Sequence, residues 1–170
     1  MRVWFDTEFT SLEEHAAELL SAGLAAESGD ECYVERIDNG LLSHSTEFVV
    51  ENVIPLFGLV PGARVNTYGE FADRITDYLL GLGEPVDLIC DYHLDRDLMQ
   101  HVLEHGTRWE DVIGLIRWEY APGEAFYTNV GQDAFDASFA EADAAGLARH
   151  HALADARALR AACLAVEADE

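Results

Sequence analysis

The N-terminal stretch Val3–Phe9 reads VWFDTEF and predicts a buried strand that carries two acids, Asp6 and Glu8. Side chains alternate across a strand, so both carboxylates point to the same side. Two neighbouring negative charges in an otherwise apolar strand repel each other and resist desolvation. A bound divalent cation is the commonest way to offset that cost. The alternative is that the strand ends here and both acids face solvent.

The order of the elements along the chain predicts an α/β fold with a mixed sheet. The turn cluster Ser28-Gly29-Asp30 favours an early hairpin, although residues 15–26 alone also fit an alanine-rich helix. We expect strands at 1–9, 19–27, 31–37 and 86–90. Helices are expected at 46–57 with a break at Pro55, at 71–82 after a capping box of Thr67 and Glu70, at 94–103 and at about 152–166. The segment 109–120 is ambiguous. No linker or repeat divides the chain, so residues 1–170 are expected to form a single domain.

The composition limits the classes of partner. The formal net charge is -23, and all ten cationic side chains are arginine. Such a charge repels long nucleic acid, which counts against a sequence-tolerant duplex binder. It does not count against an enzyme that binds only the short single-stranded end of a nucleic acid. The three cysteines lie far apart, outside any CxxC pair, which favours a reduced, intracellular protein. No stretch reaches the roughly 20 apolar residues of a spanning helix and no basic leader begins the chain, so a cytoplasmic protein without a membrane partner is expected.

The segment DYHLDRDLM, residues 91–99, offers three aspartates after the second predicted strand. Helical spacing separates them, because the apolar stripe consists of Leu94, Leu98, Met99, Val102 and Leu103. Asp95 falls near the middle of that stripe, whereas Asp97 points the opposite way and fits a solvated face. Asp91 precedes the helix and fits a capping residue. We therefore expect Asp95 to be the functional acid of this segment.

The segment RHHALADARALRAACLAV, residues 149–166, repeats the pattern. Asp155 shares a helical stripe with Leu159, Ala162 and Val166, so a carboxylate again lies on the face expected to be buried. His150 lies five residues before Asp155, a spacing that does not share one face of a continuous helix. If the two act together, His150 must lie in the loop before the first turn. The alternative is that His150 is a structural or solvated histidine, and the adjacent His151 is a decoy by residue type.

Two strand acids and two helix acids, all on faces expected to be buried, need one physical explanation. A two-metal site provides it, with two ions about 3.5–4 Å apart that clamp the attacking and leaving oxygens of a phosphodiester. Oxygen-only ligands favour Mg²⁺ or Mn²⁺ over Zn²⁺. A histidine near its solution pKa can take the proton from the attacking water.

With these motifs in place, the chain resembles the DEDDh 3′–5′ exonucleases, which are named for four acids and a histidine. The first motif, D-x-E, is matched by Asp6 and Glu8, the second by Asp95, and the third, H-x-x-x-x-D, by His150 and Asp155. The resemblance covers nearly the whole chain. The opening MRVWFDTEF looks most like the bacterial ribonuclease AS group, which are exoribonucleases that act on A-rich RNA.

The resemblance implies an RNase H-like fold with a five-stranded mixed sheet in the order 3-2-1-4-5, flanked by helices. It implies release of nucleoside 5′-monophosphates from the 3′ end of single-stranded RNA. Two Mg²⁺ or Mn²⁺ ions would be held by the four acids, with Glu8 and His150 as catalytic groups and His150 as general base. Homodimers are common among such relatives, so one is expected here. Substrate contacts are expected from Phe9, Thr10 and Leu12 after the first motif, with Phe9 able to stack on a base or to fill the core.

Two departures affect the substrate more than the chemistry. Asp91 stands where many relatives carry asparagine, which adds negative charge near the ions. A basic substrate-guiding patch is not evident, and Arg149 and Arg96, beside the motif residues, are candidates for phosphate contact or ordinary solvated arginines. Single-stranded DNA is an alternative substrate, since few residues decide it. A noncatalytic acidic module that mimics nucleic acid is an alternative from another class, and a pseudo-enzyme is a third.

Overall fold

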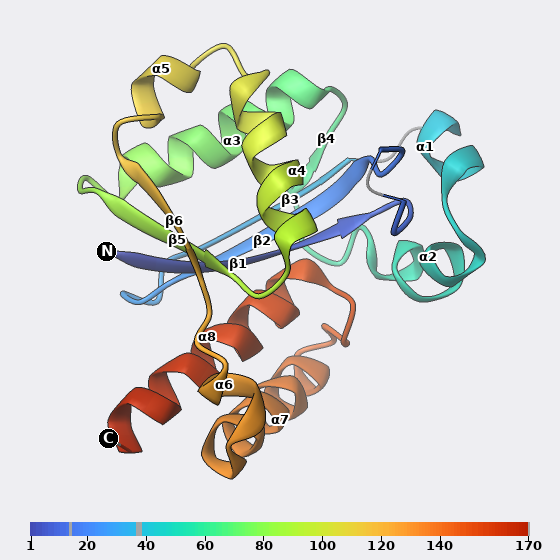
Figure 1. The fold of residues 1–170 in the computed structure, drawn as a ribbon. Helices are drawn as coiled ribbons and strands as arrows, with labels where there is room; N and C mark the ends of the chain where they lie inside the picture. The colour runs from blue at the N-terminus through green and yellow to red at the C-terminus, as the bar shows by residue number, and fades with distance from the viewer. Residues whose placement is uncertain (14, 37–38, 170) are drawn as a thin grey trace.

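One mixed sheet organises the chain in the computed structural model, which describes residues 1–13, 15–36 and 39–169 (Figure 1). In these residues the sheet has six strands in the order β4-β3-β2-β1-β5-β6. The strands are β1 (Arg2–Phe9), β2 (Leu19–Ala26), β3 (Glu31–Arg36), β4 (Arg64–Val65), β5 (Val86–Cys90) and β6 (Ile116–Tyr120). The helices are α1 (Asn39–His44), α2 (Glu47–Asn52), the 3-10 helix η1 (Ile54–Leu56), α3 (Tyr68–Gly81), α4 (His93–Glu104), α5 (Trp109–Val112), α6 (Glu124–Tyr127), α7 (Asn129–Ala144) and α8 (Ala152–Asp169).

The sheet confirms the predicted α/β class and strand order. Without β4, the order β3-β2-β1-β5-β6 is the 3-2-1-4-5 arrangement expected of an RNase H-like fold. The predicted count of five is one short, because the two-residue β4 pairs in parallel with β3 at one edge. The ambiguous segment 109–120 divides into α5 and β6. Ile37, the last residue of the predicted strand 31–37, lies outside the described residues.

Helices cover the two faces of the sheet in separate sets (Figure 1). Helices α3, α4 and α5 lie on one face, and α6, α7 and α8 lie on the other. Alternation along β1 divides its side chains between them, since Val3 and Phe5 belong to the larger core cluster and Trp4 to the cluster that includes Leu159 of α8. Asp6 and Glu8 therefore continue the row of Trp4, toward α8.

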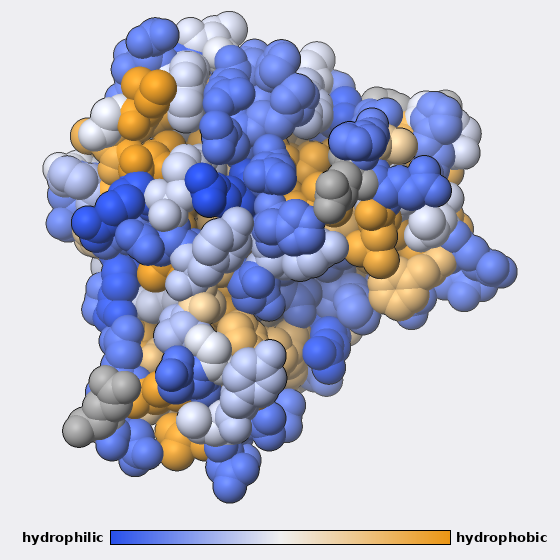
Figure 2. Space-filling model, viewed as in Figure 1, coloured by the Kyte–Doolittle hydropathy of each residue, from blue (hydrophilic) through white to orange (hydrophobic). Residues whose placement is uncertain are grey.

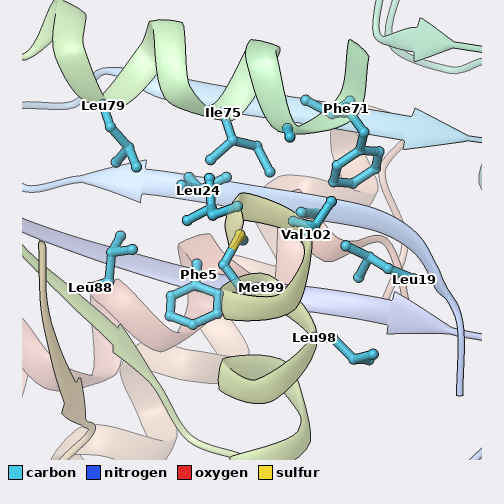
Figure 3. Packing of buried hydrophobic residues seen from close by; sticks show 14 of the residues in the cluster. Phe5, Leu19, Leu24, Phe71, Ile75, Leu79, Leu88, Leu98, Met99 and Val102 are labelled. Carbon is cyan, nitrogen blue, oxygen red and sulfur yellow. The ribbon is translucent and has the colours of Figure 1, made fainter. Parts of the chain in front are cut away.

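The larger core cluster lies between the sheet and the α3–α4 pair (Figure 3). Phe5 and Leu24 of the sheet face Ile75 of α3 and Met99 of α4, and all four side chains are completely buried. The predicted capping box begins α3, because the Thr67 hydroxyl accepts a hydrogen bond from the backbone N–H of Glu70 and the Glu70 carboxylate accepts one from that of Thr67. The predicted apolar spacing thus places α3 and α4 as one layer over β1.

Gly23 of β2 allows the start of α8 to lie directly on the sheet. A Cβ atom at this position would come within 2.3 Å of the backbone carbonyl carbon of Ala152. Gly23 is also the cross-strand partner of Asp6. A residue without a side chain is therefore needed opposite Asp6, because only then can the first turn of α8 approach β1 closely.

The surface is largely polar on the face drawn in Figure 2, where hydrophobic residues show in small, separate groups. One of these groups lies beside α2. Among the described residues, the structure contains no helix that is both long and apolar enough to cross a membrane.

Candidate metal centre

The first two acids lie where strands β1 and β5 part. The parallel pairing of the two strands ends at Trp4 and Ile89, so the next residues of each strand open a gap at the carboxyl end of the sheet. Asp6 and Glu8 line a cavity of about 280 Å³ there. The register of β1 on β2 shifts between Glu8 and Phe9, and this bulge bends β1 directly after its acids. The gap beside a central strand is a position where α/β sheets commonly bind ligands.

Asp95 reaches the same cavity from the first turn of α4. Its carboxylate atom Oδ1 accepts a hydrogen bond from the backbone N–H of Thr7 at 3.2 Å and another from the Thr7 hydroxyl at 2.5 Å. The side chain is 3% exposed, so a carboxylate is held almost out of solvent by the strand residue between Asp6 and Glu8. The predicted position of Asp95 on the apolar stripe is confirmed by this burial.

Asp155 and His150 come from the start of α8. Helix α7 ends in a turn with Gly146 at φ 83°, and the chain then reaches His150, which has φ 69°. Helix α8 begins two residues later, so His150 lies before the first turn and Asp155 within it. The left-handed conformation at His150 is uncommon for a residue other than glycine, although histidine is among the side chains that adopt it more often. It turns the chain so that both side chains line the cavity.

Two groups of carboxylates meet at Asp6. Ligand atoms of Asp6, Glu8 and Asp155 lie within 4.8 Å of one another, and so do those of Asp6, Asp91 and Asp95. Each group presents oxygen donors alone, which suits Mg²⁺ or Mn²⁺ better than Zn²⁺. One carboxylate shared by two groups also suits a pair of ions about 3.5–4 Å apart. The described residues therefore fit two hard divalent cations bridged by Asp6.

Burial and mutual repulsion raise the pKa values of these acids. Desolvation is the main cause for Asp95 and Asp155, whose pKa values rise to about 7. It also raises the pKa values of Asp6 and Glu8 well above the ordinary range, and the charges of the neighbouring acids raise them further. Without cations, the folded chain thus opposes the ionisation of its own acids at neutral pH.

The metal-free protein is therefore expected to lose stability as the pH rises from about 4 to 7. The folded pKa of Asp155 is higher than the value of about 3.9 in the unfolded chain. Stability from this group is complete below the unfolded value and is lost as the pH rises through the folded one. A difference of about three in pKa corresponds to roughly 4 kcal/mol at most, part of which is shared with the neighbouring acids.

Thermal unfolding in chelator from pH 5 to 8, of the wild type and of Asp155→Asn, measures this effect. The melting temperature of the wild type should fall toward pH 8 relative to that of the variant, and Mn²⁺ should remove the difference in trend. Parallel pH profiles of the two proteins in chelator would contradict the expectation. Using a difference between two proteins removes the contributions of acids elsewhere on the surface.

The two adjacent histidines have different surroundings. His150 is half-buried at the cavity, and its pKa is lowered by desolvation and then by the charge of Arg149. Its ring meets the edge of Phe48 of α2 at a centroid distance of 5.0 Å. His151 is 1% exposed, stacks on Tyr33 at 4.2 Å, and burial lowers its pKa to about 4. Between the two, His150 lines the cavity and is neutral at pH 7, as a proton acceptor must be.

The remaining predicted contact residues divide into two sets. Phe9 and Leu12 line the 280 Å³ cavity and also an adjoining pocket of about 560 Å³, whose apolar wall includes Phe48 and Val49 of α2. Arg149 lines the first cavity, with its guanidinium 5.4 Å from the ring centre of Phe139 and 6.0 Å from that of Phe135.

Thr10 and Arg96 line neither pocket. Thr10 is completely buried, and its hydroxyl accepts a hydrogen bond from the backbone N–H of Glu18. Arg96 lies over the ring of Tyr120 at 5.8 Å. Thr10 therefore connects the end of β1 to the loop before β2 through this hydrogen bond.

No family model and no curated protein matches the chain, whereas several solved structures do. A solved structure described as the nuclease domain of 3′hExo, a DEDDh family member, bound to rAMP, is similar to this chain. It is 14% identical, the match covers 98% of this chain and 92% of that chain, and the TM-score is 0.48.

Sequence reasoning assigned no role in the site to five residues that line the cavity, namely Thr7, Asp91, Tyr92, Phe135 and Leu159, although it noted the negative charge of Asp91 near the ions. Asp91 was expected to cap α4, but the N-cap position is Tyr92 and no side chain caps this helix. The capping interpretation of Asp91 is therefore wrong. Phe135 belongs to α7, a helix that the sequence analysis did not predict, although Phe135, Phe139 and Ala142 recur at helical spacing after Thr128, which caps the helix through Gly131.

Proposed function

We propose that this protein is a metal-dependent 3′–5′ exonuclease that removes nucleoside 5′-monophosphates from the 3′ end of single-stranded RNA. The observation that carries the proposal is the meeting of Asp6, Glu8, Asp95 and Asp155, from three separate elements, in one cavity beside His150. A cluster of like charges at this burial raises the free energy of the folded chain, so a purely structural role does not account for it. A noncatalytic mimic of nucleic acid needs its acids on the open surface, whereas Asp95 is almost completely buried.

Each step of phosphodiester hydrolysis can be assigned to some of these residues. The acids of the two groups would hold two Mg²⁺ or Mn²⁺ ions, which when bound supply the positive charge that stabilises the attacking and leaving oxygens. Neutral His150 takes a proton from the attacking water as its oxygen bonds to phosphorus. The bond between phosphorus and the 3′ oxygen of the preceding nucleotide breaks, and this oxygen takes up a proton from solvent. The products are a shortened chain with a free 3′ hydroxyl and a nucleoside 5′-monophosphate.

The two adjoining pockets support binding of a chain end. Together they have room for one or two nucleotides, and the larger has apolar walls from Phe9, Leu12 and Phe48 that suit a base. Arg149 lines the smaller cavity, its charge acts on Asp155, and it offers a cation for a phosphate. The charge of -23 opposes a long electrostatic track for the polymer. RNA as substrate, the 3′ polarity and a preference for A-rich ends follow from the resemblance of the motifs, and a homodimer and a cytoplasmic location remain predictions.

The test is incubation of the wild-type protein with 5′-labelled oligoA, a mixed-sequence RNA and oligodT, each with Mg²⁺, Mn²⁺ or chelator. We expect stepwise shortening of RNA with either ion, loss of shortening in chelator, and 5′-monophosphates as the products. A 3′-phosphorylated RNA should resist, because the reaction starts at a free 3′ end. Preference for oligodT would move the proposal to a DNA exonuclease, and an inert protein in all conditions would favour a binding module.

A further inference from the structure

Asp91 lies between the end of β5 and the start of α4, in the second of the two carboxylate groups. We propose that Asp91 is a fifth carboxylate ligand, which completes the second cation position together with Asp6 and Asp95. This inference rests on the proposed function, since it assigns a ligand to the same site. The supporting observation is that the ligand atoms of Asp6, Asp91 and Asp95 all lie within 4.8 Å of one another.

The carboxylate of Asp91 is not used by the elements that flank it. Strand β5 ends at Cys90, and the N-cap of α4 is Tyr92, which makes no side-chain capping bond. Within the part of the chain that the structure describes, no ion pair includes Asp91. The side chain lines the cavity that Asp6 and Asp95 also line.

Asp95 provides an independent indication that a ligand belongs here. The residue is 3% exposed, and both hydrogen bonds from Thr7 end on its Oδ1 atom. Among the described residues, Oδ2 accepts none, so this oxygen is available to a ligand that enters the cavity. The cavity that Asp91 lines is therefore the place where a partner of Oδ2 would bind. A cation between the two aspartates satisfies this oxygen and offsets the repulsion between them.

The number of carboxylates decides how well the second cation is held before any substrate arrives. Without Asp91 the second position has Asp95 and the oxygen of Asp6 that is left after the first position. A third carboxylate raises cation affinity, because affinity follows the charge and number of the ligands. The second cation should thus bind without help from a substrate phosphate.

Calorimetric titration of the full chain with Mn²⁺, in the absence of nucleic acid, tests this assignment. We expect two Mn²⁺ ions per wild-type chain. In Asp91→Asn the first ion should bind as before and the second about tenfold or more weakly. Asp91→Glu keeps the charge and should recover part of the loss. The matched control is Asp97→Asn, which removes an exposed acid from the same helix and should bind two ions like the wild type.

The outcomes separate this inference from the proposed function. Equal isotherms for wild type and Asp91→Asn, or fewer than two Mn²⁺ ions in the wild type, would overturn the assignment of Asp91 even if the protein degrades RNA. Loss of one ion in Asp91→Asn from a wild type that cleaves no nucleic acid would keep the assignment and reject the nuclease. Melting temperatures in chelator verify that each variant is folded.

Discussion

Replacing Asp6 with asparagine is expected to abolish nuclease activity and to stabilise the metal-free protein at the same time. Asp6 belongs to both carboxylate groups, so its loss removes the ligand that would be shared by the two cations. Metal ions supply several kcal/mol of transition-state stabilisation, and each 1.36 kcal/mol is a factor of ten in rate. We therefore expect kcat to fall by about a thousandfold or more.

The gain in stability has a separate physical cause. Burial first, and then the charges of Asp95, Asp155, Glu8 and Asp91, raise the pKa of Asp6 well above its ordinary value. Two like charges about 5 Å apart repel by about 3 kcal/mol at an effective dielectric constant of 20. Asparagine has nearly the same shape without the charge, so the melting temperature in chelator should rise by about 2 °C or more.

Rates with labelled oligoA and melting curves in chelator measure both effects on the same preparation. Asp97→Asn is the control, since it removes one charge from an exposed position and should change neither the rate nor the melting temperature appreciably. If Asp6→Asn kept a tenth of the wild-type activity, the shared-ligand role would be untenable. If it melted below the wild type in chelator, relief of charge repulsion would not be the main effect of this substitution on stability.

The second large effect is expected at His150. Asparagine is the appropriate replacement, because it tolerates the left-handed backbone conformation with φ 69° that this position requires. Loss of a general base lowers the rate by about 10²–10⁴-fold. Binding of Mn²⁺ should be unchanged, since His150 belongs to neither carboxylate group.

The pH dependence provides a readout that a structural role would not give. The pKa of His150 is lowered from 6.5, so the wild-type rate should rise with pH until His150 is neutral and level off below neutrality. His150→Asn should lack this rise. His105→Ala, at an exposed histidine directly after α4, is the control and should keep the wild-type profile. An unchanged rate in His150→Asn would mean that another group accepts the proton.

Periodicity predicted the acids of this site that lie inside regular elements. Alternation along β1 placed Asp6 and Glu8 on one side, and helical spacing separated the buried Asp95 from the exposed Asp97. For Asp155 the same spacing predicted a buried face, and the structure places it half-buried at the cavity wall. Periodic arguments work at these positions because strand and helix geometry fix the direction of each side chain.

The positions of the residues that sequence reasoning missed depend on how separate elements meet in the fold. The direction of Asp91 depends on how the chain turns between β5 and α4, and its neighbour Tyr92 takes the cap position instead. Phe135 reaches the cavity only because α7 packs against α8, a long-range arrangement that local spacing does not encode. Of the two adjacent histidines, the H-x-x-x-x-D spacing to Asp155 selected His150, and the structure places His150 at the cavity after the turn at Gly146.

The close approach of α8 to Gly23 makes catalytic competence a property of the complete tertiary structure. Asp6 and Asp155 are separated by most of the chain, and they meet only when the last helix docks on the second strand. A partly folded chain in which α8 is not docked would keep the acids of β1 and α4 in place but lack Asp155 and His150 at the cavity. Under the proposed function, such a species is expected to leave labelled RNA uncut, because the docking of the last helix completes the site.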